Sequence, residues 1–218
     1  MKKKLSPMVI LASAEFIAVA ILSVVFKVKI YDALPLLISA VVMFMQTRVN
    51  RYAFLIGGIN SIIYALAYFY MKLYGLAIST FLLSFPLQII TFINWNKNTH
   101  KGTTEIKCFT FKGRVLLFVG MAAVWAVLYV VFSALGSAYL ILDNTVTVIG
   151  VVATIICMLR YSEYAVLQFI TSVVNVILFA VMTADDISKI IWLIYSVYCV
   201  ICAAVIFSKT HKGIRSEE

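Results

Sequence analysis

Charged side chains are scarce in this chain. Asp, Glu, Lys and Arg make up only 12% of its 218 residues, whereas 64% of the residues are hydrophobic and the mean hydropathy is +1.05. Soluble domains carry roughly twice that charged fraction. The composition therefore excludes an ordinary soluble globular protein and predicts an integral membrane protein.

The residue types that carry most enzyme and metal chemistry are also few. The chain has two histidines and four cysteines, and it contains no H-E-x-x-H sequence and no Ser-His pair. The nearest approach to a catalytic carboxylate pair, Asp185 and Asp186, lies in a predicted turn, where it suits a solvated helix cap better than catalysis. Cys199 and Cys202 form a C-x-x-C inside a predicted helix, which favours two small packing residues over a redox or zinc site. We therefore predict no enzyme activity, no metal and no cofactor.

Long apolar runs fill the rest of the chain. A membrane-spanning helix needs about 17 to 25 mostly apolar residues, and polar clusters divide the sequence into eight such runs. The runs are continuous, whereas the strands of a membrane barrel would alternate. We predict an all-α integral membrane fold with eight transmembrane helices at residues 8–26, 32–47, 52–71, 75–95, 114–138, 143–160, 162–183 and 186–208.

The basic residues are distributed unevenly between the predicted loops. If the N-terminus is cytoplasmic, fourteen of the eighteen Lys and Arg residues face the cytoplasm, and only Lys27, Lys29, Lys72 and Lys189 lie outside. The positive-inside rule therefore predicts a multi-pass protein of the cell membrane with both termini in the cytoplasm. The basic loops suit contacts with membrane lipids. No aromatic residues alternate with them, so we predict no nucleic-acid partner.

A weak internal repeat organises the helices. The layout that begins at Arg51-Tyr52 recurs about 110 residues later at Arg160-Tyr161. Each unit has three helices, and one additional helix between the units makes them parallel. We predict a basic segment and leading helix at 1–31, a first three-helix repeat at 32–96, a cytoplasmic loop and linker helix at 97–142, a second three-helix repeat at 143–208, and a cytoplasmic tail at 209–218. Parallel repeats predict a solute pathway between them, with a site near the midplane and alternating access.

Polar and aromatic side chains form stripes on three of these helices. At helical spacing, each stripe falls on one helix face, and lipid would not favour such a face. The alternative interpretation is that these side chains bond helices together or anchor them at the membrane surface. The candidate binding residues are Asn60 and Tyr64; Gln88, Thr91, Phe92 and Trp95; and Gln168, Ser172 and Asn175.

These stripes carry a family resemblance. The stretches RYAFLIGGINSIIY from Arg51, KLYG from Lys72 and QIITFINWNKN from Gln88 resemble the first repeat of the PnuC vitamin transporters. The resemblance spans about residues 32–208 and is clearer in the first repeat than in the second. It implies a SWEET-like arrangement of three, one and three helices, import of nicotinamide riboside, and a cytoplasmic kinase that traps the product. Here Thr91-Phe92 replaces the family's Gly-Trp pair, and Ala165 and Gln168 replace two tryptophans.

The chemistry of the stripes limits the substrate. No Arg or Lys lies in the middle of these helices, so a phosphate would find no charge-assisted partner. Aromatic rings suit a flat neutral or cationic heterocycle, and amides suit ribose hydroxyls. Nicotinamide riboside, thiamine and nucleosides all fit this description, and a scaffold without transport is the alternative from another class. Whether the chain forms a homo-oligomer stays open.

Energy coupling depends on ionisable groups within the membrane. Glu15 is the only acid deep in a predicted helix, and a partner on a neighbouring helix is the alternative to a proton-coupling role. Arg160 and Glu163 are predicted to pair with each other, and Lys189 to reach the outer surface. Both histidines, His100 and His211, lie in basic segments that are predicted to be cytoplasmic and offer no relay through the membrane, so we predict facilitated diffusion without ion coupling.

Overall fold

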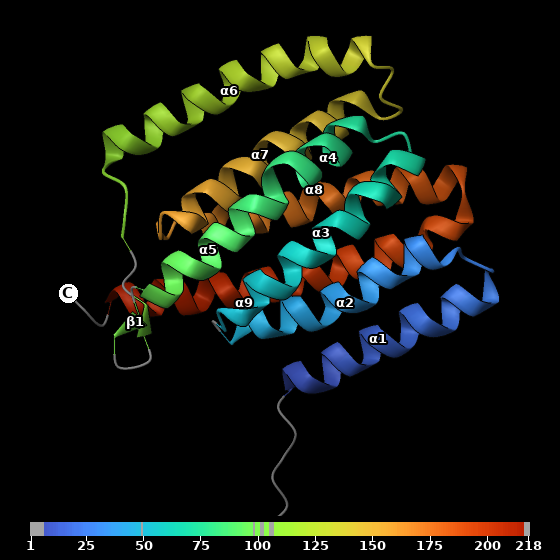
Figure 1. The fold of residues 1–218 in the computed structure, drawn as a ribbon, viewed down its shortest axis with the longest axis horizontal. Helices are drawn as coiled ribbons and strands as arrows, with labels where there is room; N and C mark the ends of the chain where they lie inside the picture. Colours follow the sequence, from blue (N-terminus) through green and yellow to red (C-terminus); the bar gives the residue numbers. More distant parts are fainter. Residues whose placement is uncertain (1–6, 49, 98, 101–102, 105–106, 216–218) are drawn as a thin grey trace, which may run out of the picture.

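The protein is a bundle of long helices. The computed structural model describes residues 7–48, 50–97, 99–100, 103–104 and 107–215, and within these ranges eight helical segments are long and apolar enough to cross a membrane. In chain order the elements are α1 (Pro7–Val25), α2 (Ile30–Thr47), α3 (Tyr52–Tyr70), α4 (Tyr74–Ser79), η1 (Thr80–Ser84), α5 (Phe85–Lys97), β1 (Thr99–His100), β2 (Thr103–Thr104), α6 (Phe111–Ala134), α7 (Leu140–Met158), α8 (Tyr164–Asp185), η2 (Ile187–Lys189) and α9 (Ile190–Arg215) (Figure 1).

These elements confirm the all-α integral membrane fold and its eight spanning segments. α4, η1 and α5 form one continuous helical segment, which corresponds to the helix predicted at 75–95. The two strands have two residues each and pair as a short antiparallel hairpin in the loop before α6. Among the predicted features, the ends 1–6 and 216–218, Asn98 and Lys101 lie outside the described residues.

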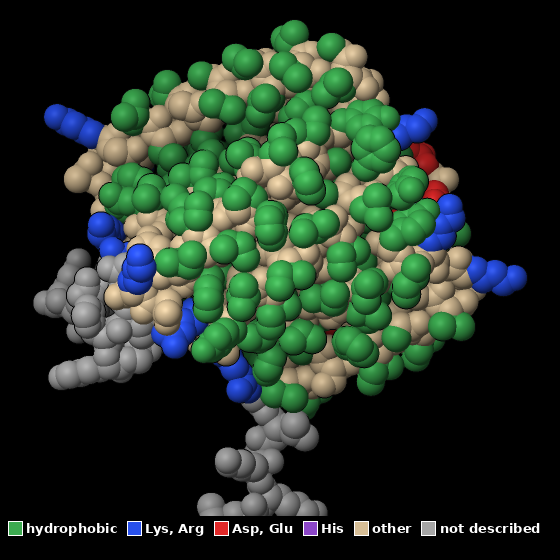
Figure 2. Space-filling view, in the orientation of Figure 1, with side chains coloured by type: hydrophobic (Ala, Val, Ile, Leu, Met, Phe, Trp, Pro, Cys, Tyr) green, Lys and Arg blue, Asp and Glu red, His purple; other side chains and the backbone are tan. Residues whose placement is uncertain are grey.

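The helices at the two edges of the bundle differ from the others. α6 lies along one edge beside α7, and α1 lies along the opposite edge against α2 and α9 (Figure 1). The side chain of Trp125 on α6 donates a hydrogen bond to Thr145 on α7, and Asn144 on α7 donates one to the Trp125 carbonyl. Apolar side chains cover the flank of the bundle, while Lys and Arg gather at its ends (Figure 2). This distribution suits a bilayer that surrounds the flank.

Helices that were assigned to different repeats pack against each other. α2 contacts α9, and α4 and α5 contact α7. These contacts join the chain segments 32–96 and 143–208 along the length of the bundle. The division into two parallel repeats remains a prediction.

Three helices end in the same way at a basic residue. Lys27 after α1, Lys72 after α3 and Arg160 after α7 all have positive φ, between 48° and 65°. The backbone N–H after each of them bonds to a carbonyl five residues back, as in a Schellman cap. A cation at this position also interacts favourably with the helix dipole.

The predicted pair between Arg160 and Glu163 is wrong. The Glu163 carboxylate instead accepts hydrogen bonds from Arg114 at 2.9 Å and from the backbone N–H of Phe109 at 3.1 Å. Residues just before and within the first turn of α6 thus bind the Glu163 carboxylate. Nε and Nη1 of Arg160 have no partner among the described residues. The ammonium of Lys189, which was predicted only to reach the outer surface, pairs with Asp32 at 3.2 Å.

Candidate functional site

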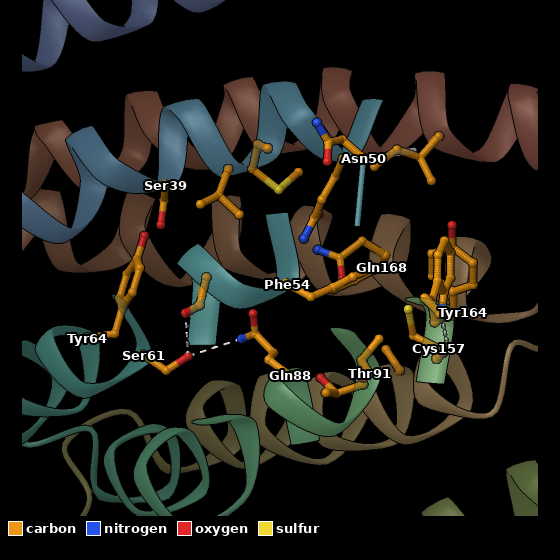
Figure 3. A pocket seen from close by; sticks show the side chains of 18 residues that line it. Ser39, Asn50, Phe54, Ser61, Tyr64, Gln88, Thr91, Cys157, Tyr164 and Gln168 are labelled. Carbon is orange, nitrogen blue, oxygen red and sulfur yellow. Dashed lines mark hydrogen bonds between the residues drawn. The ribbon is translucent and has the colours of Figure 1, made fainter. Parts of the chain in front are cut away.

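A cavity lies at the centre of the bundle, between helices from both halves of the chain. Its volume is about 200 Å³, well above the space that one water occupies. Eighteen residues from α2, α3, α5, α7, α8, α9 and the α2–α3 turn line it: Ser39, Val42, Met43, Gln46, Asn50, Phe54, Gly57, Ser61, Tyr64, Gln88, Thr91, Trp95, Ala153, Thr154, Cys157, Tyr164, Gln168 and Ile206 (Figure 3). None of these described side chains carries a charge at neutral pH, so the cavity is polar but neutral.

The helical segment that supplies Gln88, Thr91 and Trp95 is interrupted by a π-helical stretch. Pro86 follows that stretch, and a proline has no N–H to donate and clashes with the carbonyl four residues before it. The wider turn of η1, in which the Phe85 N–H bonds to the Thr80 carbonyl, accommodates this. The extra residue in this turn changes the register of α5 about its axis relative to α4, and Gln88, Thr91 and Trp95 of α5 line the cavity.

An amide and a hydroxyl join α5 to α3 in the cavity wall. Nε2 of Gln88 donates to Oγ of Ser61 at 3.1 Å, and the Ser61 hydroxyl donates to the Gly57 carbonyl at 2.9 Å. Figure 3 shows the Gln88 oxygen directed away from Ser61 and into the cavity.

Aromatic rings form the wall near the other end of the cavity. Trp95 is only 1% exposed, and its indole N–H donates to the Cys157 carbonyl at 3.0 Å. Its ring meets Phe54 edge to face at 5.0 Å between centroids and Tyr164 at 6.3 Å. Trp95 is therefore held rigidly by helices from both halves, which excludes the membrane-surface interpretation for this residue.

A second aromatic group closes the cavity toward the α3–α4 turn. The ring of Trp192 on α9 packs against Tyr64 and Tyr68 on α3 and Phe179 on α8, with centroid distances of 5.1 to 5.5 Å. These rings belong to the largest apolar core cluster of the described residues. In the opposite direction the cavity extends to Gln46 and to Asn50 in the α2–α3 turn.

Polar contacts fasten the closed end of the bundle. Asp143 at the start of α7 is fully buried and accepts from the backbone N–H groups of Gly75 at 3.0 Å and Leu76 at 2.9 Å. It thereby caps α4, whose own N-cap residue, Leu73, has no side-chain acceptor. The ion pair between Asp32 and Lys189 joins α2 to η2 at the same end.

The turn between α6 and α7 is also fastened at this end. The hydroxyl of Tyr139 donates to the Asp185 carboxylate at 2.5 Å, and this bond raises the pKa of Tyr139 to about 12. The tyrosine therefore remains a neutral donor over the physiological range.

Five of the nine predicted binding residues line the cavity, namely Tyr64, Gln88, Thr91, Trp95 and Gln168. The other four do not. Asn60 donates to the Pro35 carbonyl and to Ser39, and so bonds α3 to α2. Phe92 packs against the exposed ring of Tyr52 instead.

Ser172 and Asn175 also lie away from the cavity. The Ser172 hydroxyl is turned back onto the Gln168 carbonyl at 2.8 Å. The Asn175 side-chain oxygen is buried without a partner in the part of the chain that is described, and it does not contribute to the cavity lining. Both residues follow Gln168 along α8 toward the closed end.

Two aromatic lining residues were missed from sequence. Phe54 precedes Gly57, Ser61 and Tyr64 on one face of α3, at intervals of three and four. Tyr164 precedes Gln168 by four residues on α8. The helical period that identified the stripes would also have identified both rings if it had been extended to the helix starts.

No metal site emerges, because the described residues contain no group of three or more His, Cys, Asp or Glu side chains that could hold an ion. All four cysteines are free. Glu15 on α1 is buried, and Oε1 of its carboxyl group has no hydrogen-bond partner among the residues described. It is not among the residues that line the cavity.

Comparisons with known proteins agree with one another. The family model described as nicotinamide mononucleotide transporter matches residues 29–210. The chain is 31% identical over 150 residues to the nicotinamide riboside transporter PnuC of Neisseria mucosa, a match that covers 66% of this chain and 56% of that protein. It also resembles the crystal structure of the vitamin B3 transporter PnuC, with a TM-score of 0.73, 20% identity, and coverage of 96% of this chain and 95% of that one.

Proposed function

We propose a specific transport function for this chain, which belongs to the nicotinamide mononucleotide transporter family. The solute is a dephosphorylated vitamin or nucleoside, and nicotinamide riboside is the first candidate. It crosses the cell membrane by facilitated diffusion with alternating access. The observation that carries this proposal is the neutral cavity of amides and aromatic rings between the two halves of a membrane-spanning bundle.

The cavity favours the riboside over the mononucleotide that gives the family its name. A phosphate inside a protein wants charge-assisted hydrogen bonds, usually from Arg or Lys. The residues that line this cavity supply none. The pyridinium ring of nicotinamide riboside instead suits the rings of Phe54, Trp95 and Tyr164, because a cation is attracted to aromatic faces.

Hydrogen-bonding groups of the cavity suit the rest of such a molecule. The oxygen of Gln88 accepts, the amide of Gln168 both donates and accepts, and the buried Tyr64 hydroxyl has no partner among the described residues. Buried polar groups without partners are rare, so a bound ribose or carboxamide is a natural complement. Thiamine and other nucleosides remain the alternative substrates.

The unequal ends of the cavity support alternating access. The end near Asp32, Asp143 and Lys189 is closed by apolar packing and polar contacts, while the cavity reaches toward Gln46 and Asn50 at the other end. The basic residues Arg48, Arg51 and Lys97 lie at that second end, which the positive-inside rule assigns to the cytoplasm. We therefore propose that the structure represents an inward-facing state with both termini cytoplasmic.

Trapping in the cytoplasm completes the proposal. A kinase that phosphorylates the imported riboside would give it a charge that the neutral cavity does not accept, and the product would remain inside. The carrier then needs no ion gradient of its own. A homo-oligomer is compatible with the exposed apolar flank of the bundle (Figure 2).

Equilibrium binding to purified protein tests the proposal. We expect nicotinamide riboside to bind more tightly than thiamine, riboflavin or deoxynucleosides, and nicotinamide mononucleotide to bind at least tenfold more weakly than the riboside. Tighter binding of the mononucleotide would contradict the argument from the neutral cavity.

A matched transport assay separates a carrier from a scaffold. Replacement of Gln88, Thr91 and Gln168 with leucine should abolish uptake into proteoliposomes while the protein still expresses and folds. Unchanged uptake would show that the cavity is not part of the transport pathway.

A further inference from the structure

The hydrogen bonds of the Gln88–Ser61–Gly57 group fix the direction of one amide in the cavity. A hydroxyl group has a single hydrogen to donate. Ser61 donates this hydrogen to the Gly57 carbonyl at 2.9 Å, within its own helix. Towards Gln88 the Ser61 oxygen can then only accept, so Gln88 must present its NH2 group, as it does at 3.1 Å.

The other end of the amide faces the cavity. The oxygen of Gln88 lies over the bare backbone of Gly57, where an added Cβ would come within 2.4 Å of it. None of the described residues donates a hydrogen bond to this oxygen. Gly57 thus supplies the space for the oxygen, and Ser61 sets its direction (Figure 3).

Other hydroxyls in the wall have the same acceptor character. The hydroxyl of Thr91 donates to the Leu87 carbonyl at 2.7 Å, and that of Thr154 donates to the Gly150 carbonyl at 2.8 Å. Both hydrogens are committed to the helix backbone, so both side chains offer only lone pairs to the cavity. The side-chain oxygens that α5 and α7 contribute to the wall are therefore acceptors, and the residues that line the cavity include no cation.

We propose that Ser61 is a positioning residue that turns the oxygen of Gln88 toward the ligand, and that this wall selects ligands with N–H or O–H donors over ligands with a carboxylate. The inference rests on the proposed transport of a pyridine nucleoside and specifies its chemistry. The N–H of a carboxamide can donate a hydrogen bond to the Gln88 oxygen. A carboxylate in the same place has no hydrogen to donate, and its oxygens would repel the Gln88 oxygen.

The test compares two probes that differ only in this group, nicotinamide riboside and its carboxylate analogue. Equilibrium dissociation constants are measured for the parent protein, Ser61→Ala and Ser61→Thr. The parent should prefer the carboxamide. In Ser61→Ala the Gln88 amide is free to rotate, and the preference should fall by about three- to tenfold, the worth of one net hydrogen bond. Ser61→Thr keeps the hydroxyl and should keep the preference.

Ser196→Ala is the matched control. Ser196 is also a buried helical serine that donates to the carbonyl four residues earlier, at 2.8 Å, but it lies on α9 and does not line the cavity. This variant should not change the ratio of the two dissociation constants. An unchanged ratio in Ser61→Ala, or a parent protein that binds both probes equally, would overturn the inference and leave the transport proposal intact.

A second measurement does not depend on any ligand. In a spectrum of side-chain amides, the Gln88 NH2 signal, identified by its loss in Gln88→Leu, should exchange slowly with deuterium in the parent and in Ser61→Thr. It should exchange at least tenfold faster in Ser61→Ala. If the parent protein binds neither probe, the proposed substrate is wrong. If the Gln88 NH2 group exchanges with deuterium at the same rate in all variants, Ser61 does not position that amide.

Discussion

Trp95 and Phe92 lie three residues apart on α5, yet their surroundings differ. The indole of Trp95 is buried between both halves of the chain and bonds to the Cys157 carbonyl. Phe92 lies toward the flank, against the exposed ring of Tyr52. Helical spacing assigns both residues to one stripe of the sequence, so it is the packing of α5 against α3 and α7 that distinguishes them.

Conservative and truncating changes at these two sites should separate their roles. Trp95→Phe keeps a ring but loses the hydrogen bond and the indole surface, so we expect about tenfold weaker ligand binding and a loss of roughly 1–2 kcal/mol in the free energy of unfolding. Phe92→Ala should leave the dissociation constant within about twofold. Titration of purified protein measures both, and a larger effect at Phe92 than at Trp95 would contradict the assignment of the cavity wall.

Sequence periodicity predicted some of the residues that line the cavity and missed others. Tyr64, Gln88 and Gln168 were found because polar residues stand out in apolar helices. Phe54 and Tyr164 were missed because an aromatic residue near a helix start has several ordinary interpretations. The direction of a side chain around the helix axis depends on the π-helical segment before Pro86, and hydropathy carries no signal for that rotation.

Asp143 has a structural role, and its replacement should lower the stability of the protein strongly. It is the buried cap for two backbone N–H groups of α4. Asp143→Ala would leave both donors buried without partners, which costs about 3 kcal/mol. We expect the midpoint of thermal unfolding in detergent to fall by about 6 to 12 °C.

The matched control for this change is Lys72→Gln, at an exposed lysine near the same end of the bundle. Surface substitutions of this kind usually alter stability by less than about 0.5 kcal/mol, so the midpoint should stay within about 2 °C. Equal shifts in the two variants would show that the cap of α4 is not what Asp143 contributes.

At the scale of elements, composition predicted the spanning helices but not the contacts between them. Eight apolar runs separated by polar clusters predicted eight spanning segments, and each is present. The partner of Glu163 was predicted wrongly because a spacing of three residues is a weak constraint, and Arg114 at the start of α6, 49 residues away, reaches the carboxylate instead. The partner of Lys189, Asp32, is 157 residues distant in the sequence, and spacing along the chain carries no signal for such a pair.

The ion pair between α2 and η2 should act as a latch on the closed end. Its two side chains are mostly shielded from solvent, at 9% and 17% exposure, so removal of one partner leaves an uncompensated charge in a poorly solvated place. We expect Asp32→Asn and Lys189→Gln to raise access to the cavity from that end about three- to tenfold.

Cys157 in the cavity wall provides the measurement. With Cys108, Cys199 and Cys202 replaced by serine or alanine, the rate of its reaction with an impermeant maleimide added outside intact cells should rise in both neutralised variants. Exchange of the charges, Asp32→Lys with Lys189→Asp, should return the rate toward that of the parent. Lys72→Gln, at an exposed lysine of the same end, should have no effect, and a similar rise there would argue against a specific latch.

At the scale of the whole molecule, the proposed mechanism predicts transport without a coupled ion. In proteoliposomes that contain no kinase and no ion gradients, the riboside should enter until its inner and outer concentrations are equal. Dissipation of a proton gradient should not abolish uptake. Glu15→Gln, which removes the only buried acid of α1, should retain most of the uptake rate. Loss of uptake after either change would assign proton coupling to the carrier.

The neutrality of the cavity also has an electrical consequence. A pyridinium solute that enters it meets no countercharge among the lining side chains, so its own positive charge crosses the bilayer with it. One elementary charge is worth about 2.3 kcal/mol for each 100 mV, which corresponds to a concentration ratio of about 50. In a cell whose interior is electrically negative, such a carrier would concentrate its solute by the membrane voltage alone. Because each molecule carries one charge across the bilayer, the electrical current would be proportional to the transport rate.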